Sequence, residues 1–279
     1  NKDIIKILKA TFVTPSFFFV IITALTIIAL LDINFFRIFS QGQFQGIQNL
    51  FTTYSLERSE KVNEAILYAL FETLQIALIG TYFGVIFSFP FSILAANNFN
   101  SKVVYIPIRI ILSGIRTIPS LIWGLLAVIA FGLGPRAGVI AIIFYTIGYI
   151  SKFQYETFEG IKTDSIEALS SIGATKLQIT RYVVFPETAN ELISQIIFMF
   201  EYNIRSSSII GFVGAGGIGY LLSLYLAYFR IGALSTALIY LLIIVVIIDF
   251  IGSSVRKRFQ DPNFEEINFL YKFKILFFI

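Results

Sequence analysis

Apolar residues along this chain are gathered into six long runs, and polar or charged residues fill the segments between them. A helix needs about 20 mostly apolar residues to cross the hydrocarbon core of a membrane. The runs approach or exceed that length, except the fourth, which is short unless it begins in the preceding loop. The pattern therefore predicts an all-α membrane protein with six transmembrane helices, at residues 16–31, 65–96, 103–131, 137–150, 192–213 and 233–251.

Lys and Arg residues are concentrated on one side of these predicted spans. Most lie in the N-terminal segment, in the second and fourth connections and in the C-terminal tail. Because cytoplasmic loops of membrane proteins carry the excess of Lys and Arg, both termini are predicted to be cytoplasmic. The chain is expected to divide into an N-terminal part with the first span and an outer loop, a transmembrane core with a large cytoplasmic loop at 151–191, and a tail on the cytoplasmic face. The boundaries of these three parts are 1–63, 64–258 and 259–279.

Composition supports a membrane protein and limits its chemistry. Apolar residues make up 57% of the chain and charged residues only 14%, which excludes both an ordinary soluble enzyme and a disordered chain. The sequence contains no Cys and no His, so disulfides, thiolate metal sites and a His general base are not available. No GxxxxGK[ST] segment is present for binding ATP. We therefore expect neither an enzyme nor a bound metal or cofactor in this chain.

The cytoplasmic loop contains the most regular polar pattern. Ser165 can cap a helix that carries Glu167 in its first turn, and Gly173 allows a sharp bend. A second amphipathic helix is predicted from near Ala174, and Pro186 is expected to restart the chain toward the fifth span. From the residues alone, this helix-turn-helix is either a solvated loop or a docking element.

This segment resembles the EAA loop of ABC-importer permeases, in which Glu-Ala-Ala is followed after three residues by Gly and after nine more by Ile-x-Leu-Pro. The chain keeps this spacing, with Leu169 in place of the second Ala and Val183-Val184-Phe185-Pro186 at the end. The resemblance implies a type I (MetI-like) permease fold in a prokaryotic plasma membrane. It also implies that the loop docks on an ATP-hydrolysing subunit and transmits its closure to the membrane helices. The implied coupling residues are Glu167, Ala168, Leu169, Gly173, Ala174 and Pro186.

Four further stretches look like phosphonate/phosphate-type permeases of this family. They are RTIPSLIW at 116–123, FGLGPRAG at 131–138, EYNIRSSS at 201–208 and GFVGAGGIG at 211–219. The resemblance covers roughly residues 64–258. It implies a second copy of the permease as partner, two ABC ATPase subunits that bind Mg-ATP, and an extracytoplasmic phosphonate/phosphate-binding protein, with no nucleic acid.

Two Arg residues lie inside predicted spans. An Arg near the centre of a span costs about 2.5–3.5 kcal/mol on insertion scales, so each is expected to face a bundle interior or a wet cavity. Helical spacing places four residues of the third span on one face, namely Ser113, Arg116, Thr117 and Ser120. The same spacing places Glu201, Arg205 and Ser208 on one face of the fifth span. An Arg fork among hydroxyls suits tetrahedral oxyanions. The predicted substrate path consists of Arg116, Thr117, Ser120, Arg205, Ser206 and Ser208. Alternatively, Glu201 and Arg205 form a structural pair at i,i+4.

Pro and Gly residues mark places where the helices can bend. Pro90 and Pro119 lie inside spans, where each removes a backbone donor, either for gating or for fixed packing. The stretch after the fifth span fits G-x-G-x-x-G, but it follows a membrane helix and has no acidic residue about 20 positions on, so a dinucleotide site is rejected. We predict a gate or packing element at Pro119, Gly214, Gly216, Gly217 and Gly219.

The predicted function is the permease subunit of an ABC importer for phosphonate/phosphate-type oxyanions. The same architecture could import methionine or another amino acid, but such an importer would not need unpaired positive charge in its path. An ion-driven secondary transporter should contain inverted repeats and intramembrane carboxylates. The sequence offers no convincing repeat, and Glu72 and Glu201 are its main acidic candidates. Phosphonate, phosphate and phosphite are alike to an Arg and Ser path, so the residues do not choose among them.

Overall fold

The computed structural model describes residues 15–33, 56–57, 59–161 and 163–260, and these fold as helices joined by short connections. Contacts divide the chain into two units, Asn1–Ser55 and Leu56–Ile279. Within the first unit, helix α2 (Pro15–Asp32) matches the predicted first span, and its apolar side chains are nearly all exposed. Most of the predicted outer loop and the predicted tail lie outside the described residues, as does the segment before α2.

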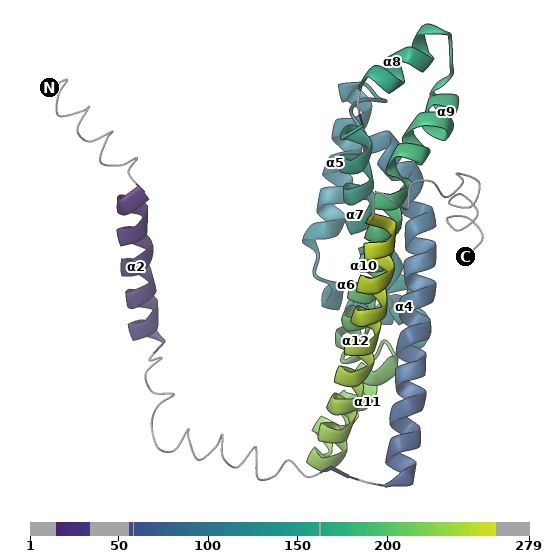
Figure 1. The fold of residues 1–279 in the computed structure, drawn as a ribbon. Helices are drawn as coiled ribbons and strands as arrows, with labels where there is room; N and C mark the ends of the chain where they lie inside the picture. The colour runs from purple at the N-terminus through teal and green to yellow at the C-terminus, as the bar shows by residue number, and fades with distance from the viewer. Residues whose placement is uncertain (1–14, 34–55, 58, 162, 261–279) are drawn as a thin grey trace, which may run out of the picture. The chain divides into compact units, whose positions relative to one another are not determined.

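The second unit is a bundle of helices (Figure 1). Its elements are α4 (Glu60–Ala95), α5 (Lys102–Thr117), α6 (Ser120–Phe131), α7 (Pro135–Glu159), α8 (Thr163–Ser171), α9 (Lys176–Ile179), the π-helical turn η2 (Thr180–Val184), α10 (Phe185–Gly211), α11 (Gly217–Ala227) and α12 (Ile231–Gln260).

Small residues let the central helices approach closely. A Cβ added to Gly80 of α4 would lie 2.5 Å from Ile142 of α7, and one added to Gly84 would lie 2.5 Å from Thr146. Close approach of this kind is how helices pack inside membranes, where lipid removes the hydrophobic driving force between them. Helices α4 and α7 therefore form the centre of the bundle.

A buried amide joins three of these helices. Asn203 of α10 is fully buried, and its Nδ2 donates hydrogen bonds to Oγ1 of Thr81 in α4 and to Oγ1 of Thr146 in α7, each at 2.8 Å. Polar groups in an apolar interior are costly unless they are paired. The three side chains therefore fix α4, α7 and α10 at one level of the bundle.

Fewer helices meet the length and composition that a membrane span requires than the sequence pattern predicts. Among the described residues, three helices are long and apolar enough to cross a membrane, namely α4, α7 and α12. The bent pair of α5 and α6 makes a fourth if it counts as one span. Helix α10 has the length but carries charged residues along it, and α2 is a shorter apolar helix. The count of six stays a prediction.

The predicted third span is broken into two helices. Helix α5 ends at Thr117 and α6 begins at Ser120, and their axes are bent by 88°. Pro119 supplies no backbone N–H, and it pushes Ile118 into an extended conformation, with φ −80° and ψ 119°. The expectation that Ser120 shares a helix face with Arg116 is therefore wrong. Pro90, by contrast, lies inside α4, which continues to Ala95.

Helix α7 extends well beyond the predicted fourth span and includes residues 151–159, which were expected in the cytoplasmic loop. Its last turns keep an inward face, because Ser151, Gln154, Tyr155 and Phe158 recur at helical spacing and are buried. The polar residues between them mask this stripe in a search for continuous apolar runs. The helix therefore ends four residues before α8 (Thr163–Ser171), the first helix of the segment that resembles the EAA loop.

The Gly-rich corner between α10 and α11 packs against two other elements. Gly214, Gly216 and Gly217 all have positive φ, of 92°, 82° and 68°, a region that other residues rarely adopt. The N–H of Gly134, before α7, donates to the carbonyl of Gly214 at 2.8 Å. The role of this corner as a gate stays a prediction.

Helix α11, which the sequence pattern did not predict, is capped from α4. The Oε2 atom of Glu72 accepts from the N–H of Gly217 at 3.0 Å, and Oγ1 of Thr73 accepts from the N–H of Ile218 at 2.8 Å. These oxygens satisfy the free donors and oppose the positive end of the helix dipole. Glu72, a candidate for ion-coupled transport in the sequence, is therefore engaged as a helix cap.

We expect Gly219→Ala to destabilise the bundle. A Cβ at Gly219 would overlap the carbonyl oxygen of Ser208 and lie 2.8 Å from Cα of Gly211, so α11 must move away from α10. Overpacking of this kind costs about 1–3 kcal/mol. The thermal unfolding midpoint of the detergent-solubilised protein measures the effect. Gly114→Ala is the matched control, because nothing lies within 4 Å of its Cβ. Equal midpoints for the two variants would contradict the close contact.

Candidate functional site

The segment that resembles the EAA loop stands at one end of the second unit (Figure 1). Helix α8 ends at Ser171, and Gly173 follows with φ +80°. The N–H of Gly173 donates to the carbonyl of Ser170 at 3.0 Å, and that of Ala174 donates to the carbonyl of Leu169 at 3.2 Å. These two bonds form a Schellman motif, which needs a residue in the left-handed conformation. The predicted sharp bend at Gly173 is confirmed.

The second helix of the segment begins later than predicted, at Lys176 and not near Ala174. Thr175 and Gln178 form a capping box. Oε1 of Gln178 accepts from the N–H of Thr175 at 2.7 Å, and Oγ1 of Thr175 accepts from the N–H of Gln178 at 3.4 Å. Thr175 therefore sets the start of the helix, which leaves Ala174 in the turn.

Pro186 does not restart the chain. Helix α9, the π turn η2 and α10 follow each other without a non-helical residue, and Pro186 lies in the first turn of α10. A proline lacks the N–H for a normal helical bond, and the wider π turn directly before it accommodates the missing bond. The helix of the predicted fifth span consequently begins at Phe185 and not at residue 192.

The predicted coupling residues divide between an outer and an inner face. Glu167, Ala168 and Gly173 are exposed, whereas Leu169 and Ala174 pack against a hydrophobic cluster beneath the segment. Leu169, the departure from the family pattern, therefore anchors α8 to the bundle. Pro186 is half-buried at the start of α10.

The exposed face of the segment also carries an apolar residue that the sequence analysis missed. The side chain of Ile172 is 81% exposed at the tip of the turn. Single exposed apolar side chains are common on protein surfaces, and it is the place of Ile172 beside the bend at Gly173 that makes it available for a contact. The signal was present in the sequence as an isolated apolar residue directly before the bend glycine.

Arg116 lies at the last turn of α5, next to the break in the span. It is half-buried, and its Nη2 has a long contact of 3.5 Å with Oγ of Ser113. The hydroxyl of Thr117 donates to the carbonyl of Ser113 at 2.8 Å, and Ser120 begins α6. Within the described ranges, no carboxylate pairs with Arg116. Among the described residues its charge thus has no acidic counterpart, at a point where the helix is interrupted.

Arg205, the second predicted path residue, has a carboxylate partner. Its Nη1 lies 2.7 Å from Oδ2 of Asp249 on α12. Glu201 pairs with Arg256, also on α12, so the alternative of a Glu201–Arg205 pair at i,i+4 is wrong. Local spacing could not reveal partners on a helix that follows much later in the chain.

The remaining hydroxyls of this group are enclosed in the bundle. Ser206 and Ser208 are buried, and Oγ of Ser208 donates to the carbonyl of Ile204 at 3.1 Å. A Cβ on Gly252 would overlap the carboxylate of Glu201, so α12 lies directly against this side chain. The predicted path residues that are neither enclosed in the bundle nor paired with a carboxylate in the described part of the chain are therefore those around the break in the span, Arg116, Thr117 and Ser120.

The chain is similar to permease proteins of phosphite transport systems. A putative phosphite transport system permease protein, HtxC of Stutzerimonas stutzeri, is 35% identical over 203 residues, which is 72% of each chain. The phosphite transport system permease protein PtxC of the same organism is 32% identical over 192 residues, 68% of this chain and 70% of the relative.

Solved structures match the fold of most of the chain. A chain from inward-facing conformations of the MetNI methionine ABC transporter has a TM-score of 0.64 at 26% identity, and covers 72% of this chain and 99% of the other. The predicted MetI-like permease fold is confirmed. The family model described as "Binding-protein-dependent transport system inner membrane component" matches residues 88–261. With its helical bundle and a segment that resembles the EAA loop, the chain belongs to this family of inner membrane transport components.

Proposed function

We propose that this chain is the permease subunit of an ABC importer for phosphorus oxyanions such as phosphite, phosphonate and phosphate. The observation that carries the substrate class is Arg116, a half-buried guanidinium at a break in a span, with no carboxylate partner in the described part of the chain. The relatives named for phosphite transport support the same class.

The chemistry around Arg116 suits a tetrahedral anion. A guanidinium presents several N–H donors in a planar fork, which binds oxyanions with charge-assisted hydrogen bonds. The hydroxyls of Ser113 and Ser120 lie on either side of the break and add neutral donors, whereas the hydroxyl of Thr117 already donates to the carbonyl of Ser113. Helix α6 also begins here, and a helix N-terminus favours negative charge. An amino acid such as methionine carries its own ammonium group and would gain less from an uncompensated cation.

The permease works as part of a larger assembly in this proposal. Two copies pair around one path, and two ATPase subunits bind the exposed face of α8 at Glu167 and the turn after it at Ile172. An extracytoplasmic binding protein delivers the anion, and Mg-ATP is hydrolysed in the ATPase subunits and not in this chain. Closure of the ATPases opens the helices outward to receive the anion, and hydrolysis resets them inward. Both termini lie in the cytoplasm.

The assembly purified with its ATPase subunits and its binding protein tests the substrate class. We expect phosphite, phosphate or methylphosphonate to stimulate ATP hydrolysis several-fold, because the loaded binding protein triggers the cycle. Sulfate, which is tetrahedral but lacks phosphorus, is the matched control, and methionine tests the amino acid alternative. Stimulation by methionine alone would overturn the proposal.

A further inference from the structure

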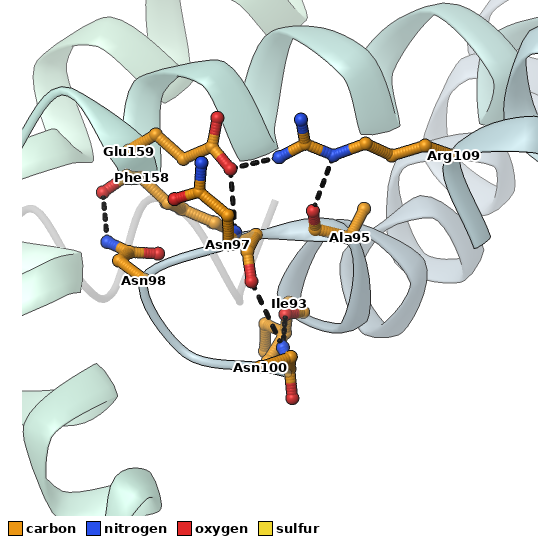
Figure 2. A network of polar contacts seen from close by, with 9 residues as sticks. Ile93, Ala95, Asn97, Asn98, Asn100, Arg109, Phe158 and Glu159 are labelled. Carbon is orange, nitrogen blue, oxygen red and sulfur yellow. Dashed lines mark hydrogen bonds and ion pairs between the residues drawn. The ribbon is translucent and has the colours of Figure 1, made fainter. Parts of the chain in front are cut away.

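A polar network joins the α4–α5 connection to the last turn of α7 (Figure 2). The guanidinium of Arg109 forms an ion pair with Oε1 of Glu159. The same carboxylate oxygen accepts from the N–H of Asn97 at 2.6 Å, and Nε of Arg109 donates to the carbonyl of Ala95 at 2.8 Å. One Arg and one Glu thus hold the end of α4, the start of the connection and the end of α7 together.

The surroundings of Arg109 fix its orientation. Its guanidinium carbon lies 4.9 Å from the ring centroid of Tyr105 and 4.4 Å from that of Tyr155. The side chains of Arg109 and Glu159 are only 28% and 19% exposed. Ion pairs with limited exposure are screened less by salt than surface pairs. Bonds in two directions and two flanking rings make this a rigid joint and not a loose surface contact.

A second contact and a hydrophobic cluster reinforce the joint. Nδ2 of Asn98 donates to the carbonyl of Phe158 at 2.8 Å, and the fully buried Phe158 ring packs in the cluster beneath the coupling segment. Ile166 and Leu169 of α8 pack against the same cluster. The joint and α8 therefore share one packed support.

The position of the joint places it between the coupling segment and the predicted path. Glu159 is the last residue of α7, and α8 begins at Thr163. Arg109 lies on α5, and two turns further along the same helix is Arg116. Helix α8 follows α7 after a short connection and packs against the same cluster, and the joint is a polar contact by which α7 holds α5.

We propose that Arg109 and Glu159 are positioning residues that transmit movement of α8 to α5 and so set the place of Arg116 during the transport cycle. This inference rests on the proposed function. A joint that only fastens the connection would affect stability. A joint that transmits movement also determines how much substrate is carried for each ATP hydrolysed.

The test uses the full assembly in proteoliposomes and measures the ratio of anion taken up to ATP hydrolysed. We expect Arg109→Gln and Glu159→Gln each to lower this ratio at least threefold, and the double variant to be no worse than either single change, because both remove the same contact. Lys152→Gln is the matched control, since Lys152 forms a more exposed pair with Glu156 on the same helix, at 3.4 Å. Its ratio is expected to equal that of the wild type.

A label on α5 gives a second measurement that needs no transport. The chain has no Cys, so Ile110→Cys, at a position that is 66% exposed, takes a fluorophore at a single site. We expect ATP binding to change its emission in the otherwise unchanged protein and not in the Glu159→Gln background. Three results would overturn the inference. They are a wild-type ratio of anion taken up to ATP hydrolysed in the Gln variants, a loss in the double variant that multiplies the two single losses, and the same ATP-induced emission change with and without Glu159→Gln. If no phosphorus oxyanion stimulates the wild type, the proposed function fails instead, and the joint is tested with the anion or amino acid that does.

Discussion

Arg116→Gln is expected to lower phosphorus-oxyanion uptake about ten- to a hundredfold, because it removes charge-assisted hydrogen bonds of about 1.5–3 kcal/mol from the path. The guanidinium has no carboxylate partner within the described ranges, so no fold-stabilising ion pair is lost with it. Initial uptake rates in proteoliposomes that contain the full assembly measure the effect.

Two further variants separate the role of Arg116 from a general effect of charge. Arg136→Gln removes an exposed cation from the first turn of α7, and we expect it to leave uptake within about twofold of the wild type. Arg116→Lys keeps the charge but loses the planar fork, so an intermediate rate is expected. Equal uptake for Arg116→Gln and Arg136→Gln would remove Arg116 from the path.

Gly173→Val is expected to abolish coupling between ATP hydrolysis and uptake. Gly173 has φ +80°, and a β-branched residue in this region costs roughly 1–3 kcal/mol, so the Schellman turn opens and α8 loses its orientation. Nothing lies within 4 Å of a Cβ at this position, so the backbone conformation and not crowding is the cause. Binding of the ATPase subunits during purification and uptake per ATP hydrolysed are the measurements.

Gly173→Asn is the control for this prediction, because Asn adopts the left-handed conformation far more readily than Val. We expect the Asn variant to retain most of the coupled uptake and to copurify with the ATPase subunits. If both variants lose coupling equally, the absence of a side chain matters and not the turn. If neither loses coupling, this turn does not orient the docking helix.

Local patterns predicted the elements whose causes are local. The helices of the core follow from the apolar runs, and the bend at Gly173 follows from a glycine at the end of an amphipathic helix. Pro119 was recognised as a bend. The 88° angle between α5 and α6 was not predicted, because the angle at such a break depends on how both helices pack against their neighbours. The Trp123 side chain donates to the carbonyl of Ile115 at 3.2 Å and holds α6 against α5 across the break, which no spacing rule could indicate.

The contacts that the sequence patterns did not predict join residues far apart in the chain. Spacing suggested that Glu201 would pair with Arg205, whereas both find partners on α12. Glu72 was considered for ion coupling and caps a helix that follows much later in the chain. Leu169 was a departure from the family pattern, and only the fold shows that it faces inward. In each case the contact that determines the role of the residue is made with a distant part of the chain, which only the folded structure brings close.

The continuous helix through α9, η2 and α10 has a mechanical consequence. From Lys176 to Gly211 it forms a rod of roughly 50 Å, with the docking segment at one end and the Gly-rich corner at the other. A tilt of about 5° at the docking end would carry the far end through roughly 4 Å. In the proposed assembly this helix acts as a lever, and the hydrogen bond between Gly134 and Gly214 connects its far end to the start of α7. A small rotation at the ATPase contact can therefore produce a much larger shift at the opposite mouth of the bundle.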